Sequence, residues 1–196
     1  MKLESLCLFC GSNRGSRPEY VEAARQFGAA LAEQGLTLVY GAGKIGLMGV
    51  AADAALAAGG RVVGVIPEFL QAKEVAHHGL DEIHITRTMH ERKAMMAERA
   101  DGFVALPGGL GTFDELFEIL TWGQLSVHSK PVGLLNVAGF FDPLLAMVRH
   151  AVQEGFMREE NLSLFVVADN IGDLLAGMRA YRPRQADNKW LELSRT

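Results

Sequence analysis

The sequence has little positive charge and no long apolar run. Its 19 Lys and Arg residues are outnumbered by 23 Asp and Glu residues, which gives a formal net charge of -4. Polymeric nucleic acid is therefore not an expected partner, because binding its phosphates requires a broad basic surface. No apolar stretch reaches the roughly 18 to 20 residues that cross a bilayer. We expect no association with a membrane.

Cysteine is also scarce. Cys7 and Cys10 are the only two, and their C-x-x-C spacing raises thioredoxin-like or metal chemistry. They lie in an apolar run typical of a strand, where side chains three apart point to opposite faces, and no second ligand pair follows at zinc spacing. Two buried core cysteines and no metal site are the prediction. The N-terminus fits neither a signal peptide nor a lipobox, so we expect a cytoplasmic protein.

Hydrophobic residues make up 49% of the chain, enough for one sizeable core. We predict a single domain over residues 1–180 and a polar tail over 181–196. Short apolar runs typical of strands alternate with segments of helical period. The strands are expected at 6–10, 36–40, 62–66, 83–86, 103–106, 132–136 and 164–168, and the helices at 20–34, 47–58, 90–100, 113–125, 143–154 and 171–178. Such alternation predicts a Rossmann-like α/β fold, with a mostly parallel sheet covered by helices on both faces.

Three predicted strands end in glycine-rich turns. In an open parallel sheet, ligands bind beyond the carboxyl ends of the strands, and glycines let the backbone approach a ligand closely. Each turn also opens a helix, whose free N–H groups favour an anion. The residues that these turns contribute as candidate ligand contacts are Gly11, Ser12, Gly41, Gly43, Gly46, Gly108, Gly109, Leu110, Gly111 and Thr112. A phosphate-bearing ligand is the prediction.

The second turn alone, Gly41-x-Gly43-x-x-Gly46, matches the dinucleotide fingerprint and keeps open an NAD-dependent oxidoreductase. The match is weak, because no acidic residue ends the next strand at the position that would bind a ribose. A P-loop is excluded, because Lys44 is not followed by Ser or Thr.

A longer set of motifs is far more specific. It comprises Leu106-Pro107-Gly108-Gly109-Leu110-Gly111-Thr112-Phe113-Asp114-Glu115, Met89-His90-Glu91-Arg92-Lys93 and Gly46-Leu47-Met48-Gly49. From about residue 6 to about residue 168, the chain resembles the LOG family of cytokinin riboside 5′-monophosphate phosphoribohydrolases, whose members are often mislabelled lysine decarboxylases.

This resemblance implies a Rossmann-like homodimer without a nicotinamide or metal cofactor, acting on a nucleoside 5′-monophosphate. It implies that Arg92 and Glu115 are the catalytic pair. The substrate contacts that it implies are Glu74, Lys93, Thr121 and the run Gly109, Leu110, Gly111, Thr112, Phe113 and Asp114. Met48, within the third motif, is a further candidate contact. Ala42, Leu110 and Phe113-Asp114 differ from the residues common in the family and bear on base preference.

The chemistry of N-glycosidic cleavage suits these two residues. The transition state places positive charge on the ribose, and the Glu115 carboxylate is suited to stabilise it or to orient the attacking water. Arg92 stays charged, so we assign it anchoring and electrostatic stabilisation. Structural alternatives exist: Thr112 and Glu115 also form a capping-box pattern, and Arg92 is able to pair with Glu91, Glu98 or another surface acid on a solvated helix face.

The sequence therefore predicts hydrolysis of the N-glycosidic bond of a purine nucleoside 5′-monophosphate to free base and ribose 5-phosphate. A non-catalytic carrier of a nucleotide or pterin phosphate and an NAD-dependent oxidoreductase are the alternatives. The choice between a cytokinin ribotide and AMP as substrate stays open at this stage.

Overall fold

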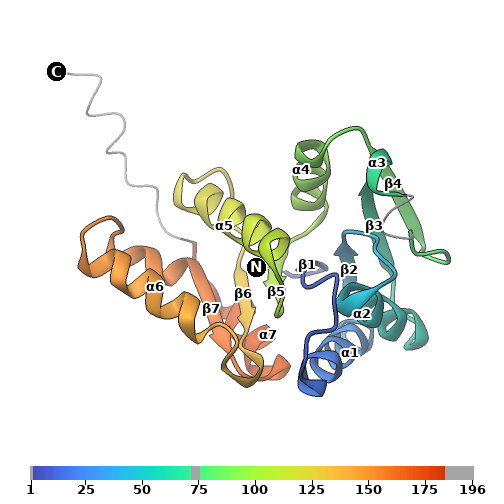
Figure 1. Ribbon diagram of the computed structural model, residues 1–196, viewed down its shortest axis with the longest axis horizontal. Coiled ribbons are helices and arrows are strands. Elements are labelled where there is room, and N and C mark those ends of the chain that lie inside the picture. The colour runs from blue at the N-terminus through green and yellow to red at the C-terminus, as the bar shows by residue number, and fades with distance from the viewer. Residues whose placement is uncertain (1, 72–75, 184–196) are drawn as a thin grey trace.

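Seven parallel strands form one sheet in the computed structural model, which describes residues 2–71 and 76–183 (Figure 1). The strands are β1 (Ser5–Phe9), β2 (Thr37–Tyr40), β3 (Val62–Pro67), β4 (Glu82–Thr86), β5 (Gly102–Ala105), β6 (Val132–Leu135) and β7 (Phe165–Ala168). Their order across the sheet is β4-β3-β2-β1-β5-β6-β7. All seven strands were expected from the sequence, and the Rossmann-like α/β prediction is confirmed.

Helices cover both faces of this sheet (Figure 1). The α-helices are α1 (Pro18–Glu33), α2 (Gly46–Ala57), α3 (Glu68–Gln71), α4 (Met89–Arg99), α5 (Leu110–Gln124), α6 (Asp142–Gln153) and α7 (Ile171–Ala180), and two 3-10 helices are η1 (Val137–Gly139) and η2 (Glu159–Leu164). Side chains of α1, α2 and α7 share one buried cluster, and those of α4 and α5 share the other. The sheet is thus the middle layer of three.

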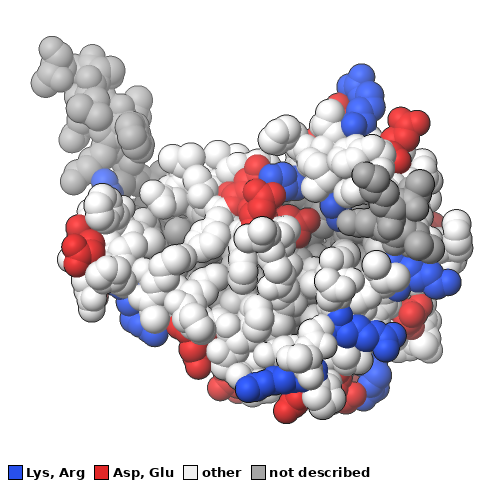
Figure 2. All heavy atoms as spheres, viewed as in Figure 1, with Lys and Arg blue, Asp and Glu red and all other residues white. Residues whose placement is uncertain are grey.

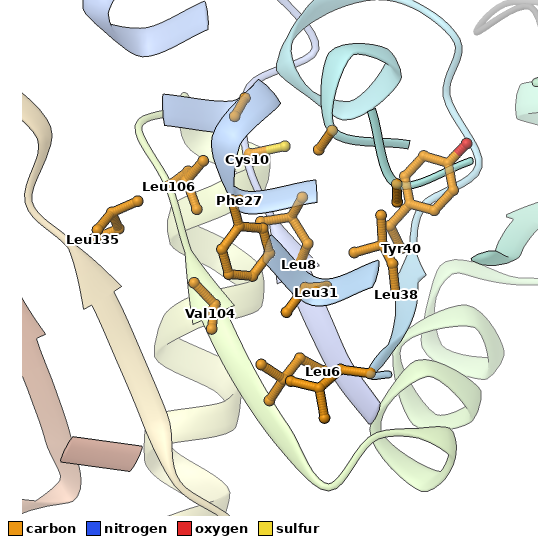
Figure 3. Close-up of a cluster of buried hydrophobic side chains, with 14 of the residues drawn as sticks. Leu6, Leu8, Cys10, Phe27, Leu31, Leu38, Tyr40, Val104, Leu106 and Leu135 are labelled. Atoms are coloured by element: carbon orange, nitrogen blue, oxygen red, sulfur yellow. The ribbon is translucent and has the colours of Figure 1, made fainter. Parts of the chain in front are cut away.

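The alternation of side chains along β1 divides the core in two. Leu6 and Leu8 point into the cluster under α1, where Figure 3 shows them packed with Phe27 and Leu31. Cys7 joins the opposite cluster, and Cys10 lies with the first. Both thiols are free and buried, as predicted. Each large side chain buried in this way contributes about 1.5–3 kcal/mol to stability.

Helix ends follow the signals in the sequence at several places. Gly35 and Gly59 adopt the left-handed conformation (φ of 67° and 75°) that ends α1 and α2. Thr88 caps α4, with its side chain accepting a hydrogen bond from the Glu91 N–H at 3.1 Å, which confirms the capping box predicted there. The short helices α3, η1 and η2 were not expected, because segments of a turn or two carry no readable period.

The start of α5 corrects one expectation. Its N-cap is Gly109, whose backbone is extended, and the helix begins at Leu110, three residues before the predicted start. Thr112 therefore lies inside the first turn, and no side chain caps this helix. The capping box read from Thr112 and Glu115 is wrong, because that pattern closes a box only when its first residue is the N-cap.

The predicted division of the chain into a domain over residues 1–180 and a tail over residues 181–196 stays a prediction. One sheet takes strands from residue 5 to residue 168, in line with one domain over 1–180. Residues 184–196 of the proposed tail lie outside the described residues. None of the described helices combines the length and apolar character needed to span a membrane.

Candidate functional site

The order of the strands locates a crevice. From β1 the chain adds β2, β3 and β4 on one side, and then returns to place β5, β6 and β7 on the other. The direction of winding reverses between β1 and β5, which pair in parallel from Leu6 and Gly102 to Phe9 and Ala105. Ligands of open α/β sheets bind at such a reversal, beyond the carboxyl ends of the strands.

All three glycine turns meet at this point. The Gly11 N–H donates to the Pro107 carbonyl at 3.0 Å, and the Leu47 N–H donates to the Gly11 carbonyl at 3.0 Å. A Cβ on Gly46 would lie 2.2 Å from the carbonyl carbon of Ser12. The turns after β1, β2 and β5 are therefore in direct backbone contact, as the sequence predicted for residues at one edge of the sheet.

A cavity of about 280 Å³ opens between two of these turns. It is lined by residues 11–15 of the turn after β1, by residues 107–109 of the turn after β5, and by Tyr20, Leu47 and Phe140. Its size suits a small ligand or part of one. The sequence reasoning missed Arg14, Tyr20 and Phe140, because only the fold brings them to the glycine turns.

The N-terminus of α5 forms one wall of the site. Gly109 is exposed at the N-cap, and Gly111 is exposed in the first turn. A Cβ built on either residue meets nothing within 4 Å, whereas one on Gly108 would lie 2.1 Å from the hydroxyl of buried Thr112. The first backbone N–H groups of a helix have no partner within it, so this turn offers donors and the positive end of a helix dipole to an anion.

Arg92 is buried and reaches the same edge of the sheet. Its side chain leaves α4, its Nε donates to the Val65 carbonyl at 3.1 Å and its Nη2 donates to the Gly41 carbonyl at 3.2 Å. Only 5% of the residue is exposed. The alternative in which Arg92 pairs on a solvated helix face is wrong; Glu91, its expected partner there, instead binds Arg87 at 3.0 Å.

Glu115 lies half-buried on the second turn of α5. Burial raises the pKa of the nearby Cys7 thiol well above its usual value, the Glu115 charge raises it further, and the Arg92 charge lowers it. Arg92 belongs to α4 and Glu115 to α5, and both helices pack side chains into the same buried cluster on one face of the sheet.

The side chain of Lys93 extends from α4 to carboxylates on α5. Its ammonium group is 3.1 Å from Asp114 and 3.0 Å from Glu118, and only 10% of its side chain is exposed. Figure 2 shows acidic and basic side chains gathered between these helices. Sequence reasoning missed Glu118, although its position four residues after Asp114 puts the two carboxylates on one helix face.

The other predicted site residues that the structure describes lie in the second glycine turn, at the start of α2 and along α5. Gly43 is buried in the turn after β2, and Met48 is buried in α2. Phe113 is half-buried on α5, where its ring stacks against Phe140 with centroids 6.4 Å apart. Leu110 is 87% exposed at the start of that helix. Glu74 lies outside the described residues.

Thr121 is not brought to the glycine turn. It lies nine residues after Thr112 on α5, about 14 Å along the helix axis, and its hydroxyl donates to the Phe117 carbonyl at 2.7 Å. Leu110, Phe113, Asp114, Phe117, Glu118, Thr121 and Trp122 instead line a shallow groove along the exposed face of α5.

Among the described residues, no three His, Cys, Asp or Glu side chains are grouped so as to hold a metal ion. The arrangement itself contains a helix N-terminus suited to an anion, a buried guanidinium and a half-buried carboxylate.

Comparison with known proteins gives consistent matches over most of the chain. A family model described as "Possible lysine decarboxylase" matches residues 48–178. A cytokinin riboside 5′-monophosphate phosphoribohydrolase of Rhodococcoides fascians is 47% identical over 178 residues, which are 90% of each chain. The enzyme of the same name from Oryza sativa subsp. japonica, LOG, is 45% identical over 182 residues, 93% of this chain and 75% of that protein.

The fold also matches a solved structure. The molybdenum cofactor binding protein of Rippkaea orientalis superposes with a TM-score of 0.68 over 92% of this chain and 98% of that chain. Its sequence is 21% identical, so this likeness concerns the fold alone.

Proposed function

The chain belongs to the LOG family of cytokinin riboside 5′-monophosphate phosphoribohydrolases, and we propose on this basis that it hydrolyses the N-glycosidic bond of purine nucleoside 5′-monophosphates. Free base and ribose 5-phosphate are the products. The observation that carries the proposal is the meeting of three glycine turns and the α5 N-terminus at the reversal of the sheet, where backbone carbonyls hold Arg92 and α5 carries Glu115.

The 5′-phosphate binds at the start of α5 in this proposal. The N–H groups of Leu110, Gly111 and Thr112 belong to the first turn, and the open space at Gly109 and Gly111 admits phosphate oxygens close to the backbone. Binding of the phosphate here places the ribose near Glu115, one turn further along the same helix.

Glu115 and Arg92 then carry the chemistry. As the bond between the anomeric carbon and the base nitrogen breaks, positive charge develops on the ribose, and the Glu115 carboxylate stabilises it. A water molecule adds to the anomeric carbon, its oxygen forms the new bond, and its proton passes to the departing base. Arg92, held by two backbone carbonyls, provides a fixed cation that orients the substrate.

The direct test is a nucleotide panel with product identification. AMP and a cytokinin riboside 5′-monophosphate are incubated with the protein, and the base and ribose 5-phosphate are identified by mass spectrometry. We propose that AMP is a substrate alongside the cytokinin ribotide. Tight binding of both without turnover would indicate a carrier instead, and an NAD-linked absorbance change would indicate an oxidoreductase.

We also propose that the protein is a homodimer and that it lies in the cytoplasm. The groove along α5 and the loop after it expose large apolar side chains, with Leu110 at 87%, Leu125 at 54%, Val127 at 67% and Phe117 at 36% exposure. Covering such a surface with a second copy removes apolar area from water. Cell fractionation tests the location, and light scattering tests the dimer.

A further inference from the structure

We propose that Gly41 is a positioning residue for Arg92: a hydrogen in place of a side chain at residue 41 creates the space that the guanidinium occupies. The inference rests on the proposed function, in which Arg92 acts on the substrate. It assigns Gly41 a role different from the ligand contact expected of a glycine in this turn.

The guanidinium is fixed by the ends of two neighbouring strands. Tyr40 of β2 pairs with Gly64 of β3, so the next residues, Gly41 and Val65, lie side by side at the carboxyl edge. Their carbonyls accept from Nη2 at 3.2 Å and from Nε at 3.1 Å. Two acceptors on rigid backbone define the plane of a guanidinium, because its donors have a fixed geometry.

Arg92 keeps donors for a ligand in this position. A guanidinium has five N–H donors; two are used by the carbonyls, and Nη1 contacts the Met89 sulfur at 3.8 Å. These contacts, which Arg92 makes with residues in the ranges 2–71 and 76–183, do not use all the N–H groups on Nη1 and Nη2. The strand ends hold one edge of the group and leave the other for the substrate.

The need for a glycine at residue 41 comes from the lack of space for a side chain and not from the backbone conformation. A Cβ on residue 41 would lie 1.8 Å from Nη2 and 3.0 Å from Cζ of Arg92. The left-handed conformation in this turn is at Ala42, with φ of 59°, whereas Gly41 does not have a positive φ. The turn therefore has an alanine where the backbone favours glycine, and a glycine where a methyl group would meet Arg92.

A methyl group at residue 41 is therefore expected to move Arg92 without unfolding the chain. The atom that it meets is the far end of a flexible side chain, which is able to rotate away. A shift of about 1 Å in a positioned group reduces turnover about 100-fold. We expect Gly41→Ala to lower kcat by that factor and to leave the fold intact.

A double-mutant cycle tests the link between the two residues. Turnover of AMP is measured for the wild type, Gly41→Ala, Arg92→Ala and the double variant. If Gly41 acts through Arg92, the methyl group costs about 100-fold when Arg92 is present and less than about threefold when Arg92 has been truncated, because effects transmitted through one group are not additive. If the two substitutions instead reduce turnover by independent factors that multiply in the double variant, the proposal is overturned. Near-normal turnover of Gly41→Ala would overturn it too.

Gly133→Ala is the matched control. Gly133 is buried in β6, and its Cβ would lie 2.8 Å from the Met178 sulfur and 2.9 Å from a Leu174 methyl, also the ends of flexible side chains. This variant is expected to lower the melting temperature and to keep kcat. An equal loss of kcat in Gly133→Ala would mean that crowding of the core explains the Gly41 result, which would also overturn the proposal.

A measurement without substrate separates this inference from the proposed function. The buried Arg92 Nε–H should give a slowly exchanging resonance in a proton–nitrogen NMR spectrum, assigned by its loss in Arg92→Lys. Gly41→Ala should shift or broaden it, and Gly133→Ala should not. If the wild type is inactive but the Arg92 resonance still shifts in Gly41→Ala, the proposed reaction alone is refuted. If the Arg92 resonance is unchanged in Gly41→Ala, the positioning role alone is refuted.

Discussion

The ammonium group of Lys93 on α4 lies 3.0 Å from a Glu118 carboxylate oxygen on α5. Asp114, one turn earlier on α5, lies 3.1 Å from the same ammonium group. Arg92 is next to Lys93, and Glu115 is next to Asp114. The ion pairs therefore fix the spacing of the two helices that carry the proposed catalytic residues.

Replacing Lys93 with methionine should weaken the protein. The change keeps an apolar stem but removes the charge and leaves two carboxylates facing each other. We expect a loss of about 1–2 kcal/mol in unfolding free energy, between the values of exposed and buried pairs, measured by urea denaturation. Arg87→Met, which breaks the exposed pair with Glu91, should cost only about 0.5 kcal/mol. Equal effects would mean that Lys93 is an ordinary surface charge.

This stabilisation should disappear at high pH. Burial opposes the charge on Lys93, but Glu118 and Asp114 outweigh it and raise its pKa above the usual 10.5. A raised lysine pKa adds stability that is complete below the unfolded value and is lost as pH rises through the folded one. The difference between wild type and Lys93→Met should be constant from pH 7 to 9 and shrink above about 10.5; a difference unchanged at pH 11.5 would contradict this.

Glu115→Gln should separate binding from turnover. Glutamine keeps the shape and removes the negative charge that stabilises the ribose cation, so kcat should fall by two or more orders of magnitude. Nucleotide binding, followed by calorimetry, and the melting temperature should change little. Glu98→Gln, on the exposed part of α4, provides the control. Near-normal turnover of a well-folded Glu115→Gln protein would favour a carrier over an enzyme.

The 5′-phosphate should be required for efficient cleavage. Adenosine lacks the phosphate that we propose binds the first turn of α5, so its kcat/KM should be far below that of AMP. Gly109→Ala adds a methyl group where no protein atom lies within 4 Å, and should raise the KM for AMP about tenfold or more, since one hydrogen bond to a charge contributes about 1.5–3 kcal/mol. Gly123→Ala, on the same helix but remote from its start, should leave KM unchanged. Comparable kcat/KM for adenosine and AMP would exclude this phosphate site.

Phe117→Glu should disrupt the proposed homodimer. A carboxylate in the middle of the α5 groove would have to be desolvated against the second copy. Light scattering at micromolar concentration should give twice the 21.3 kDa of one chain for the wild type and a single-chain mass for the variant. Phe156→Glu, at a residue 89% exposed outside the groove, should remain dimeric. A wild type that is monomeric at every concentration would remove the dimer.

The sequence was most informative about the strands, the helices and the turns. Apolar runs such as Val62–Pro67 are buried along their whole length, so their composition alone identifies them. The glycines after β1, β2 and β5 were predicted to gather because parallel strands bring their carboxyl ends to one edge. The pairing of β1 with β5 was not predictable, because no local pattern records which distant strands are neighbours.

The surroundings of individual site residues were harder to predict. Nothing near Arg92 in sequence indicates that its guanidinium is buried, since its partners Gly41 and Val65 are 51 and 27 residues away. The pattern of Thr112 and Glu115 suggested a capping box, but the extended conformation of Gly109 starts the helix earlier. Local motifs identified the residues, and long-range packing determined their surroundings.

The junction of β1 and β5 also affects how the protein folds. The Asp101 carboxylate, just before β5, accepts a hydrogen bond from the Ser5 N–H, 96 residues earlier. Closing so long a loop is entropically unfavourable, so contacts of this range form slowly. Strands β1 to β4 are neighbours in the sheet, but the pocket lacks its proposed phosphate-binding wall until β5 docks beside β1.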